Sequence, residues 1–574
     1  MIDVSGIALS LDAAIDTSDN CHVGIVARAL GIEKEAIHSL QLVKRSVDAR
    51  KKSHVHFTTT FRLGLNDAVE QHLLAHTPKG LTARPAREVQ PLEFPMCQVP
   101  DVAPIVVGMG PAGLFAALYL ARCGLRPVVI ERGRAVEERM RDVAAFQETG
   151  VLDPQSNIQF GEGGAGTFSD GKLTTNIKNP LTAHVLQWFV EAGAPNDILV
   201  AAHPHLGSDN LPAIVRTVRE EIIARGGTVL FGTHVVDWSF DAGKLTSITL
   251  DQAGKRTVYS ARILILACGH SARDTFELCR DTGLTMEQKP FSVGVRIEHT
   301  QQDINRAQWG KAAKHPALGA AEYKLAVHLP SGRSVYTFCM CPGGEVVPAA
   351  SEEGGIVVNG MSRYARDGRN ANAALLVNVD PRDFGSEDVL AGVALQRSIE
   401  QAAFRVSQAY GGEAYQAPCQ RVGDFLESVK QEVGQKQCSA TTPCKNKDTL
   451  FVQKDLQDDK AYPLPTYARG VVEAPLTQCF PPFVTQALAE ALPLMGRKLR
   501  GFDDPNALMT APETRSSSPV RICRDKTLQA YGHDGVSTGV YPCGEGPGFA
   551  GGIMSAACDG LRVAQCVAQT YAVL

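Results

Sequence analysis

The chain has 574 residues, 44% of them hydrophobic, and a formal net charge of −4, values typical of a globular protein with more than one hydrophobic core. This balance gives no overall bias toward nucleic acid or anionic membrane, no apolar run is long enough to cross a bilayer, and no secretory signal is recognisable at the start. The fifteen cysteines contain no C-x-x-C pair, so we expect reduced thiols in a cytoplasmic protein and no zinc or iron–sulfur site.

Residues 1–95 are expected to form a small α+β module followed by a linker. Residues 29–40 are predicted to be a helix, and residues 55–63 alternate like a strand with one wet face. Residues 78–103 are rich in proline, which is typical of a linker. A basic run between the helix and the strand either contacts phosphate or RNA or is a solvated connection, and we favour the second interpretation; it contains Lys44, Arg45, Arg50, Lys51 and Lys52.

The clearest motif lies at residues 104–131. A buried strand at 105–107 is followed by Gly108, Gly110 and Gly113 in G-x-G-x-x-G spacing, a helix at 114–123 and a second strand at 127–130. The glycines allow a tight turn, close approach of a pyrophosphate, and close packing of the helix on the sheet. The second strand ends at Glu131, which is placed to accept hydrogen bonds from a ribose and disfavours a 2′-phosphate. This order of elements predicts a dinucleotide site.

A second glycine-rich stretch follows a predicted helix at 134–149. Residues 160–176 match both G-x-G-x-x-G and the front of a P-loop, but the flanking strand and helix are missing and Leu173 stands where a P-loop needs Ser or Thr. We therefore predict a loop whose backbone amides and Ser169 hydroxyl line an anionic or flavin surface.

Further α/β elements are predicted between residues 211 and 271. They are a helix at 211–225, strands at 228–231 and 234–240, a small meander at 245–250 and 257–260, and a buried strand at 262–267. The buried strand ends at Cys268, Gly269 and His270, as expected for the ligand-binding edge of a doubly wound sheet.

Residues 290–509 resemble an inserted substrate domain, with strands at 291–297 and 325–329 and a helix at 390–408. A further strand carries Cys339 and Cys341, whose spacing places both sulfurs on one face. This face meets a redox centre or is a small apolar wall, and alternate strand positions are a poor geometry for a disulfide.

The C-terminal segment returns to the nucleotide-binding pattern. A strand at 539–541 and a glycine-rich turn at 544–552 lead into a helix at 554–568, whose first amides are free to face an anion.

These motifs together resemble the two-domain flavoprotein superfamily of glutathione-reductase and para-hydroxybenzoate-hydroxylase type, and more closely the bacterial group of uncharacterised FAD-dependent dehydrogenases. The segments that carry the resemblance are VVGMGPAGLFAA with VIER, FGEGGAGTFSDGKL, LACGHSARDTF, PFSVGVRIEH, YTFCMCPGGEVV and GVYPCGEGPGFAGGI. The resemblance implies an α/β fold with a Rossmann-like FAD-binding domain in two parts, residues 96–289 and 510–574, an inserted α+β substrate domain at 290–509, and the N-terminal module at 1–95.

The resemblance also implies FAD as the cofactor and assigns residues to it. By their position, His270, Cys339 and Cys341 are candidate catalytic residues, and these three and Glu545 are candidate proton donors, of which none stands out. The implied cofactor-binding residues are Gly108, Gly110, Pro111, Ala112, Gly113, Glu131, Arg132, Gly163, Gly164, Gly166, Ser169, Gly171, Lys172, Val235, Cys268, Gly269, Gly544, Glu545, Phe549, Gly551, Gly552 and Ile553.

The expected activity is that of an FAD-dependent oxidoreductase that exchanges a hydride between flavin N5 and a small organic substrate. Because a second dinucleotide fingerprint and a C-x-x-x-x-C pair are missing, NAD(P)H is expected to bind only transiently. Two alternatives remain open: an RNA-modifying flavoprotein that uses the basic N-terminal module, for which we expect less support, and a non-catalytic flavin redox sensor.

Overall fold

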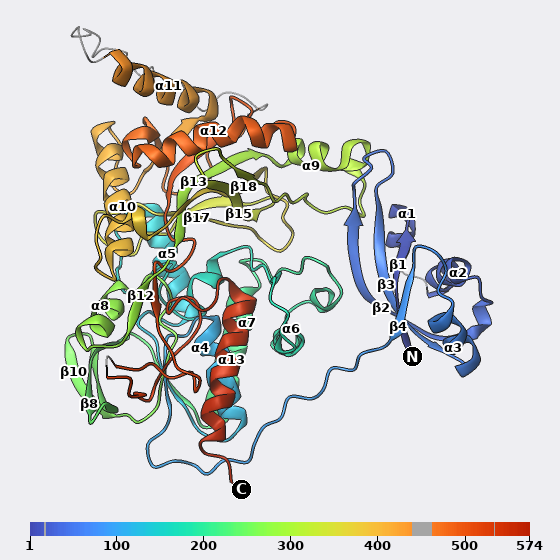
Figure 1. Ribbon diagram of the computed structural model, residues 1–574, viewed down its shortest axis with the longest axis horizontal. Helices are drawn as coiled ribbons and strands as arrows, with labels where there is room; N and C mark the ends of the chain where they lie inside the picture. The colour runs from blue at the N-terminus through green and yellow to red at the C-terminus, as the bar shows by residue number, and fades with distance from the viewer. Residues whose placement is uncertain (17–18, 439–461, 533, 574) are drawn as a thin grey trace.

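The computed structural model describes residues 1–16, 19–438, 462–532 and 534–573. Figure 1 shows the N-terminal module beside the main body, with a long connection leading away from it. No helix in these described ranges is long and apolar enough to cross a membrane.

The N-terminal module is a four-stranded sheet in the order β2-β3-β1-β4 with three helices. Its elements are β1 (Ile2–Leu9), α1 (Leu11–Ile15), α2 (Asp19–Leu30), β2 (Ile37–Asp48), β3 (His56–Leu65), α3 (Asp67–Ala75) and β4 (Thr82–Pro85). The expected strand at 55–63 is confirmed as β3. The expected helix at 29–40 is wrong, because Gly31 ends α2 in a left-handed conformation (φ 69°) and Leu40 and Leu42 then pair with β3 as part of β2.

The basic run of this module is partly engaged with the main body. Arg45 N donates to Val200 O at 2.8 Å, Ala202 N donates to Arg45 O at 2.9 Å, and Lys52 Nζ donates to Ala307 O. The first part of the run belongs to β2 rather than to a connection, and Arg45 docks the module through its backbone. The side chains of Lys44, Arg50, Lys51 and Lys52 are exposed, as the solvated interpretation expects.

The nucleotide-type domain is built on a five-stranded parallel sheet in the order β23-β11-β5-β6-β7. Val106 points into one core with helices, while Ile105 and Val107 point into another with a three-stranded meander, so both faces of the sheet are covered. The strands are β5 (Ile105–Val107), β6 (Val128–Ile130), β7 (Thr228–Leu230), β11 (Leu264–Leu266) and β23 (Val540–Pro542). The meander is β8 (Thr233–Asp241), β9 (Lys244–Gln252) and β10 (Lys255–Ser260). The helices are α4 (Pro111–Arg122), α5 (Val136–Thr149), α6 (Leu181–Glu191), α7 (Leu211–Ala224), α8 (Arg273–Asp281) and α13 (Ile553–Gln569).

The inserted domain contains a seven-stranded sheet in the order β14-β15-β18-β13-β21-β19-β20, which lies above the nucleotide-type domain in Figure 1. Its strands are β13 (Phe291–Thr300), β14 (Ala326–His328), β15 (Ser334–Cys341), β18 (Asn370–Val379), β19 (Ala417–Arg421), β20 (Val471–Glu473) and β21 (Leu508–Glu513). Helices α9 (Gln301–Trp309), α10 (Ala391–Ala409), α11 (Val422–Cys438) and α12 (Pro482–Lys498) accompany it, with a small sheet of β16 (Glu345–Pro348) and β17 (Val358–Met361). A second small sheet, β12 (Met286–Gln288) with β22 (Val520–Ile522), packs in the core of the nucleotide-type domain. The boundary expected at residue 509 falls inside β21.

Candidate functional site

The turn between β5 and α4 requires glycine at two positions. A Cβ at Gly108, whose φ is 93°, would lie 2.3 Å from the carbonyl oxygen of Ala267, the residue after β11, and one at Gly113 would lie 1.9 Å from Gly108 O. These separations are far below van der Waals contact, so the glycines let α4 start directly at the carboxyl edge of the sheet.

The C-terminal glycine turn lies against the same helix. A Cβ at Gly544 would lie 2.7 Å from Ala112 Cβ, and one at Gly560 would lie 2.1 Å from Ala112 O. Figure 1 shows α4 and α13 together below the inserted domain. Two segments more than 400 residues apart in the chain therefore bring two helix N-termini to one edge of the sheet.

The second glycine-rich stretch lies at this meeting point. A Cβ at Gly164 would lie 2.9 Å from Gly110 Cα, and one at Gly166 would lie 3.2 Å from Ile553 Cγ1 and 3.7 Å from Pro111 Cγ. At Gly269, Gly551 and Gly552 the Cβ positions face open space. The structure thus brings the glycine segments at 108–113, 163–166 and 544–553 together, with open space in front of Gly269, Gly551 and Gly552.

Glu131 ends β6 with both carboxylate oxygens engaged by backbone groups. Its Oε2 accepts from Met109 N at 2.8 Å, and its Oε1 accepts from Gly133 N and Gly161 N, each at 2.9 Å. A carboxylate has about four acceptor positions, so one remains for a further donor.

The two neighbours of Glu131 in the predicted set are held by other contacts. Arg132 donates to Asp274 at 2.8 Å and lies over the Phe160 ring at 4.4 Å. Val235 is buried in β8, the strand that starts beside Glu131.

Four predicted residues of the Gly163–Lys172 loop have protein neighbours. A Cβ at Gly163 would lie 2.0 Å from Thr167 Oγ1, and one at Gly171 would lie 3.0 Å from Gly207 N. Ser169 Oγ donates to Gly166 O at 2.7 Å and accepts from Gly171 N at 3.0 Å, so this hydroxyl shapes the loop. Lys172 Nζ lies 3.7 Å from Glu322 Oε1.

Residues 268–270 follow β11 as predicted. Burial raises the pKa of Cys268 to about 12, so its thiol is protonated at neutral pH. Burial lowers the pKa of His270 to about 3, and the charges of Arg515 and Arg273 act in the same direction. His270 is therefore a neutral imidazole, with Nδ1 3.0 Å from Ser271 Oγ.

Glu545 is a buried carboxylic acid in the C-terminal turn, and its pKa is raised. Burial raises its pKa to about 7, while the charge of Lys289 and a hydrogen bond with the Gly552 backbone act in the opposite direction. The charge of Cys339 raises the pKa further. Nearby Phe549 carries the Arg524 guanidinium 3.6 Å from its ring centre.

Cys339 and Cys341 lie at an irregularity of β15. The pairing of β15 with β18 shifts between Phe338 and Cys341, a β-bulge, and Cys339 adopts φ 41°. The regular strand alternation from which we predicted the direction of the two sulfurs is thus broken. Cys341 Sγ lies 3.3 Å from Cys339 O.

A buried arginine supports this bulge. Arg296 of β13 donates to Cys339 O at 2.9 Å and to Asn372 Oδ1 at 3.0 Å, lies 3.8 Å from Cys341 Sγ, and is paired with Glu513. The sequence analysis missed Arg296 and Glu513. A signal was present in β13, where Ser292, Gly294, Arg296 and Glu298 alternate with apolar residues and so form a polar face on a buried strand.

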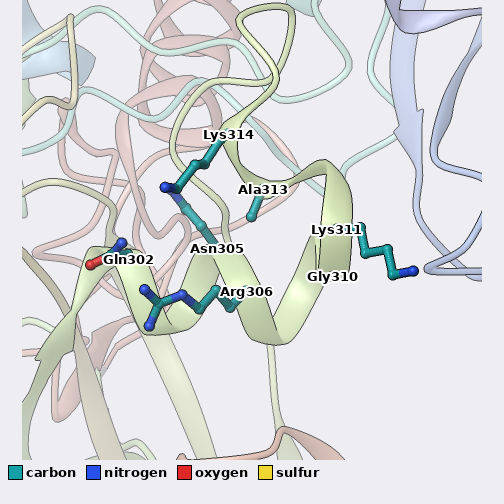
Figure 2. A pocket seen from close by; sticks show the side chains of 7 residues that line it. All are labelled: Gln302, Asn305, Arg306, Gly310, Lys311, Ala313 and Lys314. Atoms are coloured by element: carbon teal, nitrogen blue, oxygen red, sulfur yellow. The ribbon is translucent and has the colours of Figure 1, made fainter.

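A surface pocket lies elsewhere, on α9 and the turn after it, where Lys311 extends toward the N-terminal module (Figure 2). None of the predicted site residues lines it. The lining residues are Gln302, Asn305, Arg306, Gly310, Lys311, Ala313 and Lys314.

Comparison with known proteins identifies relatives of both parts of the chain. Residues 290–451 and 442–516 match the family model "FAD-dependent protein, C-terminal domain-like", and residues 1–63 match a domain of unknown function, DUF8436. An uncharacterized protein of Clostridium beijerinckii is 40% identical over 573 residues, covering 99% of both chains. The chain belongs to this FAD-dependent protein family.

Solved structures similar to this family member are distant flavoproteins. A geranylgeranyl bacteriochlorophyll reductase-like protein from Thermoplasma acidophilum has a TM-score of 0.34 at 11% identity, with 82% of this chain and 78% of that chain covered. A flavocytochrome c3 fumarate reductase has a TM-score of 0.32 at 11% identity and the same coverage.

The residues of the open region fit the cofactor of this family, FAD. The first turns of α4 and α13 leave backbone N–H groups without partners inside the helix, and such groups bind the oxygens of a pyrophosphate. The open space at Gly269, Gly551 and Gly552 allows a flat ring system to approach the backbone.

Proposed function

We propose that this protein is an FAD-dependent oxidoreductase that acts on a small organic substrate between the nucleotide-type domain and the inserted domain. The observation that supports it best is the convergence of three glycine segments on two helix N-termini, with open space in front of Gly269, Gly551 and Gly552. Bound FAD would supply a two-electron carrier whose N5 accepts or gives a hydride.

The protein would bind and orient this carrier through its backbone. Amides near Gly110 and Ala112 would hold the pyrophosphate, and the remaining acceptor position of Glu131 would accept a ribose hydroxyl. Amides at Gly551 and Gly552, at the start of α13, would stabilise negative charge at the flavin edge.

Proton movement would fall to Glu545. A carboxyl with a pKa of about 7 is present in both protonation states at neutral pH, which suits a general acid or base. His270 would serve as a neutral hydrogen-bonding group, because its pKa of about 3 excludes an imidazolium near pH 7.

The test is anaerobic reduction of the purified protein reconstituted with FAD. NADH, NADPH and a panel of metabolites are mixed with it while absorbance near 450 nm is followed, and we expect bleaching by at least one donor within the time of an enzymatic turnover. A protein that binds no FAD would refute the proposal. Bound flavin that no donor reduces and no acceptor reoxidises would instead indicate the redox sensor.

An RNA-modifying function has less support. The candidate RNA contacts were Lys44, Arg45, Arg50, Lys51 and Lys52. Of these, Lys52 donates to Ala307 O of the main body, and Arg45 docks there through its backbone while its guanidinium lies over the Phe57 ring at 5.3 Å.

A further inference from the structure

Cys339 and Cys341 differ in exposure, as the two members of a redox pair do. Cys339 is partly exposed beside Phe338, which is 42% exposed, whereas Cys341 is completely buried. In dithiol chemistry the accessible sulfur attacks and the protected sulfur resolves the mixed disulfide.

The local backbone departs from a regular strand at the two cysteines. The β-bulge replaces regular alternation, Cys339 adopts a left-handed φ of 41° that costs energy in a residue with a Cβ, and Cys341 Sγ lies 3.3 Å from Cys339 O. The reason for not expecting a disulfide here, the spacing of alternate positions in a regular strand, therefore does not apply.

The charges around the pair favour a thiolate at the exposed sulfur. The hydrogen bond from Cys341 lowers the pKa of Cys339 to about 6, and the charges of Arg296 and Lys172 act in the same direction. The hydrogen bond and burial raise the pKa of Cys341 well above its usual range. The pKa is raised for Cys21, Cys97, Cys123, Cys268, Cys279, Cys419, Cys479, Cys523, Cys543, Cys558 and Cys566, so Cys339 differs from these cysteines in having the character of an attacking thiolate.

We propose that Cys339 and Cys341 form a reversible dithiol–disulfide couple and that the substrates of this protein include low-molecular-mass disulfides. The assignment of a substrate class rests on the proposed function, whereas the sulfur chemistry itself needs no flavin.

The steps balance as ordinary thiol–disulfide exchange. The Cys339 thiolate attacks one sulfur of a disulfide RSSR, forms a mixed disulfide and releases RS⁻. Cys341 then loses its proton and attacks Cys339 Sγ, which breaks the mixed bond and releases the second RS⁻, and the proton converts one leaving group to RSH. The cysteine pair is oxidised by two electrons and the disulfide is reduced by two electrons. Arg296 is a positioning residue, because it holds the Cys339 carbonyl and lies beside Cys341 Sγ.

The chain offers a direct readout of this couple. Trypsin cleaves after Arg333 and Arg363, and the peptide between these sites contains Cys339 and Cys341 and no other cysteine. Purified full-length protein is equilibrated in mixtures of reduced and oxidised glutathione, quenched in acid, alkylated and analysed by mass spectrometry. We expect a fraction of this peptide to resist alkylation and to be lighter by two hydrogens, rising as the oxidised share of glutathione rises.

Variants separate the roles of the two sulfurs. Cys341→Ser should accumulate a glutathione adduct on Cys339, Cys339→Ser should show no adduct on Cys341, and the matched control Cys566→Ser in α13 should behave like the wild type. At pH 7, Cys339 should be alkylated at least about tenfold faster than Cys566.

A peptide that is fully alkylated on both cysteines at every glutathione ratio would overturn the couple, and this result needs no variant to fold. The same sample reports on the cofactor through its absorbance. If the protein contains flavin but the two cysteines never form a disulfide, the couple is refuted and the proposed function is unaffected. If the protein binds no FAD but the two cysteines do form a disulfide, the couple is supported and the proposed function is refuted.

Discussion

The carboxylate of Glu131 accepts a hydrogen bond from the backbone N–H of Gly161 at 2.9 Å. This contact joins the end of β6 to the second glycine-rich stretch, 30 residues later in the chain. The acid at the strand end therefore organises protein loops as well as being placed for a ribose, and its loss should affect both folding and cofactor affinity.

Replacing Glu131 by alanine should lower the free energy of unfolding by about 3 kcal/mol, because three backbone N–H groups lose a charged acceptor in a buried place. Urea unfolding of the apoprotein measures this. The exposed Glu148, replaced by alanine, serves as the control and should change stability by less than about 0.5 kcal/mol. Equal effects of the two substitutions would contradict the proposed role of Glu131.

Gly110→Ala separates cofactor binding from folding. An added Cβ would lie 3.8 Å from Gly164 Cα, an ordinary contact, and the φ of Gly110 is −73°, so the fold should tolerate it. The methyl group would nevertheless project where the backbone is expected to approach the pyrophosphate. We expect the Kd for FAD to rise at least about tenfold, or about 1.4 kcal/mol, with little change in Tm. Gly319→Ala, at an exposed position with open space, is the matched control and should leave the Kd unchanged.

Glu400 joins the two large domains. It accepts from Arg273 of α8 at 2.8 Å and 2.9 Å and from Arg515 twice at 3.0 Å, and all three side chains are buried. Glu400→Ala would leave two buried guanidinium groups without their main partner and should lower stability by about 3–5 kcal/mol. For comparison, Glu427→Ala removes only an exposed contact with Lys430 and should cost less than about 1 kcal/mol. Calorimetric unfolding distinguishes the two outcomes.

The buried acid Glu545 should make stability depend on pH. Its pKa is raised to about 7 from the usual 4.5, so between these values the folded chain retains a proton that the unfolded chain releases, and stability falls as the pH rises through this window. Glu545→Gln removes this loss. We expect the Tm of the variant to match that of the wild type near pH 4.5 and to exceed it near pH 8.

Glu287→Gln, on the exposed side of β12, provides the reference for this pH series. Its Tm should follow the wild type at every pH. A Tm difference between Glu545→Gln and the wild type that does not change with pH would show that Glu545 keeps an ordinary pKa.

Much of the fold could be predicted from the sequence. The elements around the first motif have strong local signals, since β-branched residues form β5 and β6 and glycines mark the turns, and they occur where expected. The helix expected at 29–40 failed because residues 37–42 are stabilised by pairing with β3, a contact between distant parts of the chain that local propensity does not reveal.

Only part of the candidate site could be predicted, because only part of it depends on local sequence. The need for glycine at a tight turn can be recognised from the neighbouring residues, so Gly108, Gly113 and Gly544 could be identified. Arg296 and Glu513 come from strands 217 residues apart, and their pairing follows from the order of strands in the inserted sheet. The bulge at Cys339 likewise depends on the register with β18.

The docking of β2 has a consequence for the isolated module. β2 is an edge strand, and Arg45 donates its N–H to Val200 O and accepts at its carbonyl oxygen from Ala202 N of the main body. Cut away from that body, the strand would present unpaired backbone groups, and such edges recruit other chains. The excised module should therefore self-associate. In the intact protein, residues 200–202 pair with the edge of β2 and prevent this association.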